Sequence, residues 1–295
     1  PKKCSRQDIV GAISGNLCRC TGYWPIINAG LKSYDSSVAR WLSHLPRQQA
    51  PVDAADEDTG IDHVAYRTLQ SEEELSQLLG GFDPAPDMAP EKHSPPMLVA
   101  GTTDTWVAVN QDLVEFDRIL DISQIHSLRQ IVLQDKTLSI GACVTHSELY
   151  AFFQQPEQRS TAMLELMQRF GSPQIRNRGT IGGNICGGSP IADWSPVLLA
   201  LDASVTIKCA DGHRQVSLDD FFLGYRQTCV RPHEYLASIE FDVPQDWSML
   251  SFSKISKRYE DDISSVCAAI FIERNGTLIS NMRLAYGGVA ATPLR

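Results

Sequence analysis

The cysteine pair Cys18 and Cys20 is the first pattern in this sequence that could do chemistry. A disulfide between residues two positions apart is strained, because neighbouring extended residues point their side chains away from each other. On one turn, however, two thiolates at this spacing can bind the same soft metal centre. An iron–sulfur cluster takes four thiolates, so two more would have to come from elsewhere. The spacing alone leaves metal binding and two incidental cysteines both open.

Two glycine-containing segments form the second pattern. Residues 98–104 are an apolar strand followed by Gly-Thr-Thr-Asp, and residues 178–190 hold five glycines within ten residues. Glycine lets a backbone approach a ligand closely, and successive N–H groups in such turns bind anions. Neither segment has the spacing of a Rossmann turn or the Gly-Lys-Ser/Thr of a Walker loop. Together they suit the pyrophosphate of a dinucleotide. The alternatives are an ordinary strand and turn for the first and a surface loop for the second.

The remaining reactive residue types give weaker patterns. Asp193, which follows the second glycine segment, could cap a helix or bind a ligand hydroxyl. The seven histidines show no H-x-x-x-H or H-x-x-E-H spacing, so we expect no zinc site and assign all of them structural or surface roles. No G-x-S-x-G hydrolase signature is present. Four cysteines lie among apolar or small residues and are expected to be buried thiols: Cys143, Cys186, Cys209 and Cys267.

The composition is that of a folded protein of about two domains. Of 295 residues, 43% are hydrophobic and 21% charged, which excludes a disordered chain, a collagen and a coiled coil. With 26 basic and 35 acidic residues the net charge is −9, so the chain has no broad attraction to nucleic acid or an anionic membrane. Eight cysteines are too few for a disulfide scaffold and fit the cytosol. Both ends are expected to be cuts in a longer polypeptide.

The elements that must position these residues divide the chain into four regions. Residues 1–45 are predicted to be helical, with a capping box at Ser5 and Asp8 and a second helix opened by Pro25. Residues 46–61, rich in Pro, Ala and acids, are a linker. Residues 62–245 mix strands and helices irregularly, and 246–295 contain three strands with a hairpin at Asn275-Gly276, so the fold class is α+β. Strands are expected at 97–100, 118–122, 131–133, 138–140, 204–208, 235–241, 251–256, 264–273 and 278–286, and helices at 71–79, 146–153, 162–170 and 194–201.

These motifs resemble two parts of the xanthine dehydrogenase family. Residues 16–23, which contain Cys18 and Cys20, resemble its second [2Fe-2S] domain. Residues 98–104 and 178–190 resemble the flavin-binding domain of molybdenum hydroxylases, whose fold is that of vanillyl-alcohol oxidase (the PCMH type). Further matching segments follow in the family's order at 222–228, 234–236, 254–263 and 286–288. The resemblance implies a helical [2Fe-2S] fragment, a PCMH-type FAD-binding domain and the start of a C-terminal flavoprotein α+β domain.

The resemblance also implies cofactor contacts. Cys18 and Cys20 would be two ligands of a [2Fe-2S] cluster whose other two ligands come from an upstream C-x-x-C, and this chain lacks that motif. The first glycine turn departs from the commoner A-G-G/N-T pattern, with Thr102 at the variable position. No general acid or base is expected. The implied FAD contacts are Leu98, Val99, Ala100, Gly101, Thr102, Thr103, Asp104, Phe170, Gly171, Thr180, Gly183, Asn184, Asp193, Leu236 and Lys254.

The activity implied by the resemblance is that of an electron-transfer subunit. In the family, electrons pass from molybdenum through two [2Fe-2S] clusters to FAD and then, as hydride, to NAD+, while hypoxanthine and xanthine become urate in purine catabolism. The molybdenum cofactor would lie on a molybdopterin-binding large subunit or domain. We therefore expect a cytoplasmic protein in a higher oligomer of heterodimers, with neither nucleic acid nor membrane as a partner.

Several alternatives stay open within and outside this activity. An aldehyde oxidase, a carbon monoxide dehydrogenase and a hydroxybenzoyl-CoA reductase are enzymes of the same kind. Fusion of the iron–sulfur region to the flavin domain disfavours the last two, whose flavin subunits are separate. A flavin-binding module without turnover is the non-enzyme alternative. Oxygen could replace NAD+ as acceptor. Because it has no molybdenum site, the chain alone is expected not to oxidise xanthine.

Overall fold

The computed structural model describes residues 5–13, 24–33, 65–80, 95–259 and 261–295. The chain divides into two compact units, Pro1–Glu57 and Asp58–Arg295. The Cys18 and Cys20 pair and the expected linker at 46–61 lie outside the described residues. In the described parts of the chain, no helix combines the length and the apolar character needed to cross a membrane.

The described part of the first unit is a pair of packed helices, α1 (Arg6–Ile13) and α2 (Trp24–Ser33). The predicted capping box is present at the start of α1. The Ser5 hydroxyl accepts from the Asp8 amide at 3.2 Å, and the Asp8 carboxylate accepts from the Ser5 amide at 2.7 Å. These bonds satisfy amides that have no partner within the helix, which is why α1 begins where the sequence indicates.

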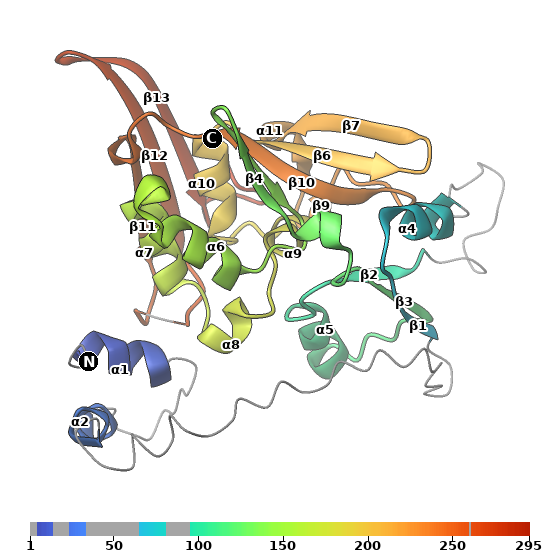
Figure 1. The fold of residues 1–295 in the computed structure, drawn as a ribbon, viewed down its shortest axis with the longest axis horizontal. Coiled ribbons are helices and arrows are strands. Elements are labelled where there is room, and N and C mark those ends of the chain that lie inside the picture. Colours follow the sequence, from blue (N-terminus) through green and yellow to red (C-terminus); the bar gives the residue numbers. More distant parts are fainter. Residues whose placement is uncertain (1–4, 14–23, 34–64, 81–94, 260) are drawn as a thin grey trace. The chain divides into compact units, whose positions relative to one another are not determined.

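The second unit is built around sheets of different kinds (Figure 1). A parallel sheet has the strand order β1-β3-β2, and an antiparallel sheet has the order β4-β5-β10-β6-β7. A third sheet, β11-β12-β13, is antiparallel and includes the predicted hairpin, with Gly276 at φ 63°. The strands are β1 (Ala65–Thr68), β2 (Met97–Val99), β3 (Arg118–Asp121), β4 (Ile131–Gln134), β5 (Thr137–Gly141), β6 (Ser204–Cys209), β7 (Gly212–Ser217), β8 (Phe222–Gly224), β9 (Gln227–Thr228), β10 (Tyr235–Asp242), β11 (Leu250–Ile255), β12 (Val266–Asn275) and β13 (Leu278–Gly287).

Helices cover these sheets and connect them. In Figure 1, α10 lies beside β12 and β13, and α7 lies beside β11; both pairs are in contact. The main core joins the inner faces of the two antiparallel sheets to α6, α7, α9 and α10, and it includes Trp194 and Phe153, both fully buried. The helices are α4 (Glu72–Leu79), α5 (Thr105–Gln111), α6 (His146–Gln154), α7 (Thr161–Arg169), α8 (Pro173–Arg176), α9 (Ile181–Cys186), α10 (Trp194–Ala200) and α11 (Leu218–Phe221).

A carboxylate on α4 fastens the parallel-sheet layer to the five-stranded sheet. Glu72 accepts hydrogen bonds from Lys208 at 2.7 Å, Tyr235 at 2.8 Å and Ser127 at 2.6 Å. Burial raises the pKa of Glu72, but these bonds outweigh burial and leave its pKa below the ordinary value. The carboxylate is therefore charged at neutral pH and fixes the layer that carries the first glycine turn.

The α+β class expected from the sequence is confirmed, and each predicted strand and helix of the second unit is found within about two residues. The sequence reasoning did not predict the strands β1, β7, β8 and β9 or the helices α5, α8, α9 and α11. The prediction of four buried thiols was wrong at two positions. Cys143 and Cys267 are buried, but Cys186 is exposed and Cys209 is half-buried. Each of these two is the last residue of its element, α9 and β6.

Candidate functional site

The first glycine turn follows the carboxyl end of β2, in the parallel sheet. Thr102 has a φ of 61°, a left-handed conformation that β-branched residues rarely adopt. Its hydroxyl donates to the Gly101 carbonyl at 2.8 Å. Asp104 then begins α5 without a side-chain cap bond. Residues held in such strained conformations cluster at ligand-binding turns, so Thr102 supports a binding role for this turn.

The second glycine segment is a short helix rather than a loop. The Thr180 hydroxyl accepts from the Gly183 amide at 3.1 Å and caps the start of α9. The Gly182 amide donates to the Ala142 carbonyl at 2.9 Å, and the Ala142 amide donates to the Ala237 carbonyl at 2.9 Å. The start of α9 is thus fixed against the end of β5 and against β10. Ala237 directly follows Leu236, so two predicted segments lie next to each other.

The two glycine segments meet, although they are far apart in the sequence. A Cβ atom on Gly101 would lie 2.0 Å from the Arg178 carbonyl oxygen, and one on Gly182 would lie 2.5 Å from the Ala142 carbonyl oxygen. These two glycines are therefore required by close approach of one chain segment to another. That explanation differs from the sequence-based one, in which the glycines let the backbone lie close to a phosphate.

Gly183 is open to a ligand in this junction, and the next residue, Asn184, carries an acceptor without a partner among the described residues. Apart from the Thr180 hydroxyl at 3.1 Å, a Cβ atom on Gly183 would meet no atom within 4 Å outside the local helix backbone, and Gly183 is exposed. The side-chain oxygen of Asn184 is buried and accepts no hydrogen bond from any described residue. A buried acceptor without a donor is costly in a native protein, so it calls for a partner from outside the chain. FAD offers such donors in its ribityl and ribose hydroxyls and in its flavin N3–H group, so the residues present fit it.

A buried ion pair joins the start of α10 to β11. The Asp193 carboxylate accepts from the Lys254 ammonium at 2.6 Å and also from the Ser264 hydroxyl, and all three residues are buried. The sequence suggested that Asp193 could cap the helix, but its side chain makes no cap bond. Asp193 and Lys254, two of the FAD contacts expected from the sequence, are thus direct partners although they are far apart in the sequence.

Arg169, which the sequence analysis missed, holds the segment that follows Lys254. Its guanidinium donates to the carbonyl oxygens of Lys254 and Tyr259 and to the Ser256 hydroxyl, at 2.5, 3.3 and 3.2 Å. It also lies 4.8 Å from the centre of the Tyr259 ring. Ser264 was missed as well. In the sequence, Arg169 is an arginine at a helix end and Ser264 a serine at a strand start, and neither position carries a local signal.

The remaining predicted residues frame the same region. Phe170 and Gly171 directly follow α7, and Gly171 has a φ of 46°. The Arg176 guanidinium donates to both of their carbonyl oxygens, at 2.9 and 2.6 Å. The Leu236 side chain is 4% exposed and belongs to the main core. It lies in β10, which packs against α9. In the described residues, no group of histidine, cysteine or acidic side chains could hold a metal ion.

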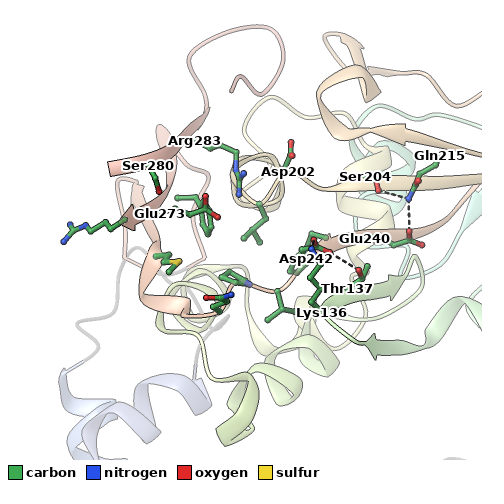
Figure 2. Close-up of a pocket in the computed structure, with 18 residues that line it drawn as sticks. Lys136, Thr137, Asp202, Ser204, Gln215, Glu240, Asp242, Glu273, Ser280 and Arg283 are labelled. Carbon is green, nitrogen blue, oxygen red and sulfur yellow. Dashed lines mark hydrogen bonds and ion pairs between the residues drawn. The ribbon is translucent and has the colours of Figure 1, made fainter. Parts of the chain in front are cut away.

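A cavity of about 770 Å³ lies elsewhere, between the ends of β5 and β10 and the β12–β13 hairpin (Figure 2). It contains none of the predicted cofactor residues. Some of its charged groups are already engaged within the chain: Lys136 pairs with Asp242 at 2.6 Å, and Arg283 donates to the Ala200 carbonyl at 2.6 Å. Size alone would favour this cavity, but the meeting of the two glycine segments, the left-handed β-branched Thr102 and the Asn184 oxygen that no described residue bonds favour the glycine junction as the candidate site.

Comparison with known families gives two matches. The family described as the FAD binding domain in molybdopterin dehydrogenase matches residues 82–245, which is more than half of the chain. The family described as the CO dehydrogenase flavoprotein C-terminal domain matches residues 251–295. The first match contains both glycine segments and Asp193, and the second contains Lys254, so the buried ion pair joins the two matched regions.

Individual relatives agree with these families. Xanthine dehydrogenase of Drosophila pseudoobscura pseudoobscura is 28% identical over 98% of this chain, and xanthine dehydrogenase/oxidase of Gallus gallus is 33% identical over 67% of it. These matches cover 25% and 15% of the relatives, so the chain spans a quarter or less of their length. A carbon monoxide dehydrogenase structure from Hydrogenophaga pseudoflava has a TM-score of 0.69 at 26% identity, over 78% of this chain and 76% of that chain. Quinoline 2-oxidoreductase from Pseudomonas putida 86 has a TM-score of 0.67 at 25% identity, over 77% and 75%.

Proposed function

Because this chain belongs to the family of FAD-binding domains in molybdopterin dehydrogenases, we propose that the junction of its two glycine segments, together with the Asp193–Lys254 pair, binds FAD in an electron-transfer role. The observation that carries this proposal is the meeting of the two segments at Gly101 and Arg178, together with a buried Asn184 oxygen to which no described residue donates a hydrogen bond. A strained turn, an open glycine and an unmatched acceptor are together the features of a site shaped for a ligand.

The chain's own residues divide the task of holding FAD between backbone and side chains. The first turn, with Gly101 and Thr102, and the start of α9 at Gly183 would bind the cofactor through backbone groups. Asn184 would accept a hydrogen bond, and Asp193 and Lys254 would supply fixed charges. When bound, FAD would supply a redox centre that accepts electrons from molybdenum through iron–sulfur clusters and gives hydride to NAD+. The protein positions and shields that centre, so no general acid or base is assigned.

We further propose that the whole protein is a molybdenum hydroxylase of the xanthine dehydrogenase type. In that arrangement, residues 1–45 belong to a [2Fe-2S] domain with Cys18 and Cys20 as ligands, 46–61 are a linker, 62–245 bind FAD, and 246–295 begin the C-terminal flavoprotein domain. A molybdopterin-binding subunit or region would complete a cytoplasmic oligomer that converts hypoxanthine and xanthine to urate. Support comes from the xanthine dehydrogenases that align with 98% of the chain.

A second candidate, the flavin part of another molybdenum hydroxylase, is favoured by the solved structures. Carbon monoxide dehydrogenase and quinoline 2-oxidoreductase share the fold at TM-scores of 0.69 and 0.67. Addition of xanthine, carbon monoxide or quinoline to the complete molybdenum-containing protein, followed by the bleaching of its flavin absorption, distinguishes these possibilities. Bleaching by xanthine in the absence of oxygen, with the flavin bands restored when NAD+ is added, supports the first candidate. Bleaching by one of the other two compounds, but not by xanthine, supports the second.

The FAD proposal itself is tested by the visible spectrum of the purified chain, with acid release of any flavin. We expect two flavin bands that dithionite bleaches, and FAD in the released material. Gly183→Val should abolish FAD retention, because a β-branched side chain fills the open space at the start of α9. Gly80→Ala is the matched control, since its new Cβ would lie an ordinary 3.6 Å from the Ala210 Cβ. A colourless chain that takes up no added FAD, or normal FAD content in folded Gly183→Val, would contradict the proposal.

A further inference from the structure

His146, the first residue of α6, contacts three segments that carry proposed FAD contacts. Its backbone amide donates to the Gly179 carbonyl at 3.1 Å. Its ring centre lies 4.3 Å from that of Phe170, and its Nδ1 atom accepts from the Trp194 indole N–H at 3.1 Å. The residue is 2% exposed. One imidazole therefore joins the end of α7, the approach to α9 and the start of α10.

The contacts of His146 fix its protonation state. Since Nδ1 accepts from Trp194, the ring proton is on Nε2. A second proton on Nδ1 would face the indole N–H, donor against donor. Burial, and then the nearby Arg176 guanidinium, lowers the pKa of His146 to about 3. At neutral pH the ring is thus an uncharged spacer with one orientation.

We propose that His146 is a positioning residue of the FAD site. Its side chain and backbone hold the Phe170 turn, the Gly179–Thr180 turn and the start of α10 in one arrangement. This inference rests on the proposed function. His146 acts on the proposed cofactor contacts through the residues next to its own partners. Trp194 directly follows Asp193, whose carboxylate accepts from Lys254, and Gly179 directly precedes the Thr180 cap of α9. A shift of the imidazole therefore displaces both the charged and the backbone parts of the site.

The arrangement of partners distinguishes this role from that of an ordinary core residue. A core position needs only apolar volume, which a leucine of similar size supplies. The Trp194 indole, in contrast, requires an acceptor at a defined point, and leucine leaves its N–H buried without a partner. Asparagine restores an acceptor, because its Oδ1 occupies about the position of Nδ1. Leucine and asparagine should consequently differ in FAD binding rather than in stability alone.

The test measures two quantities on the full 295-residue chain freed of FAD: the dissociation constant for added FAD, from quenching of flavin fluorescence, and the melting temperature without FAD. We expect His146→Leu to weaken FAD binding about tenfold or more, equivalent to about 1.4 kcal/mol. His146→Asn should stay within about threefold of the unmodified chain. Val205→Ala, a substitution at a fully buried position in β6, is the control. It should lower the melting temperature but leave the dissociation constant within about twofold.

The outcomes separate this inference from the proposed function. If the unmodified chain binds no FAD, the proposed function fails and this inference fails with it. If that chain binds FAD and His146→Leu binds equally well, only the positioning role is wrong. Equal weakening by Val205→Ala also overturns it. Should His146→Leu not fold, Trp194→Phe replaces it: binding about tenfold weaker than in His146→Asn supports the proposal, and equal binding overturns it.

Discussion

The two halves of the proposed FAD site are built by opposite means. On one side, Gly101 and Gly182 are required because other backbone atoms lie where a side chain would be. On the other side, Asp193, Lys254 and Ser264 are buried polar groups that satisfy one another. The first half depends on the absence of side-chain atoms and the second on their presence. A backbone half tolerates no added atoms, whereas a side-chain half tolerates no missing partner.

The charged half should show the largest effect. Lys254→Met removes the cation that faces Asp193 and leaves a buried carboxylate supported mainly by Ser264. Loss of one partner of a buried pair costs about 3–5 kcal/mol, and we expect that decrease in the free energy of unfolding at pH 7 without FAD, measured by urea denaturation.

An exposed ion pair in the following segment is the control for Lys254→Met. Arg258 bonds Asp262 at 3.3 Å, and 54% of the arginine side chain is exposed. Arg258→Met should therefore cost less than about 1 kcal/mol. Similar losses in the two variants would mean that the Asp193–Lys254 pair contributes no more than a surface pair, and the contrast between the halves would fail.

The backbone half should show the next largest effect. Gly101→Ala places a Cβ atom 2.0 Å from the Arg178 carbonyl oxygen, so the two glycine segments must move apart. We expect a loss of about 1–3 kcal/mol in the free energy of unfolding, as for other overpacked sites, together with loss of FAD retention. Gly80→Ala, with an ordinary contact at 3.6 Å, should change neither quantity appreciably. Unaltered stability of Gly101→Ala would show that the two segments do not pack as closely as described.

Acid should destabilise the folded chain around His146, which contacts both halves of the site, because His146 must stay neutral when folded. Its pKa is about 3 in the folded chain, lowered by burial and then by Arg176, and about 6.5 when unfolded. Below pH 6.5 the unfolded chain therefore binds a proton that the folded chain does not. The contribution of neutral His146 to the free energy of unfolding is fully present above that pH. It falls as the pH decreases, by about 1.4 kcal/mol per pH unit down to about pH 3.

The contribution of His146 to acid destabilisation is measured by difference. Urea denaturation at pH 7, 5.5 and 4.5 should show the unmodified chain losing stability relative to His146→Asn, whose side chain does not titrate. Parallel pH dependences for the two chains would mean that His146 is accessible to protons in the folded state. That result would also remove its role as an uncharged spacer.

The sequence predicted the elements of the fold better than it predicted their contacts. The capped helix at Ser71 and the hairpin at Gly276 depend on residues a few positions apart, so local chemistry determines them. Helix α9 was missed because Ile-Gly-Gly-Asn has little helix propensity. It forms because the Thr180 cap and the bond from Gly182 to Ala142 hold its first turn.

The candidate site shows the same division. The position of Asp193 after a glycine segment suggested a cap or a ligand contact, and Lys254 could be proposed only by resemblance. Their pairing could not be predicted, because the partner of each lies 61 residues away and no local pattern connects them. Arg169 and His146 carry no motif at all, and their partners are backbone carbonyls and an indole supplied by tertiary packing. The glycines were recognised as unusual, but Gly101 and Gly182 face backbone, which only the folded arrangement could reveal.

Substitution of Thr102 is expected to have the smallest effect on the free energy of unfolding, and it is the one substitution here that should stabilise the chain. It tests whether backbone strain is a feature of the backbone half. The residue is held at φ 61°, which costs a β-branched side chain more than asparagine. Thr102→Asn should thus raise the free energy of unfolding without FAD by about 0.5–1 kcal/mol, even though the bond from the hydroxyl to Gly101 is lost. Thr103→Asn, at a neighbouring residue without positive φ, should bring no gain, and thermal unfolding of the two variants compares them. A destabilised Thr102→Asn would mean that the hydroxyl contact outweighs backbone strain, and that side-chain chemistry fixes this half of the site as well.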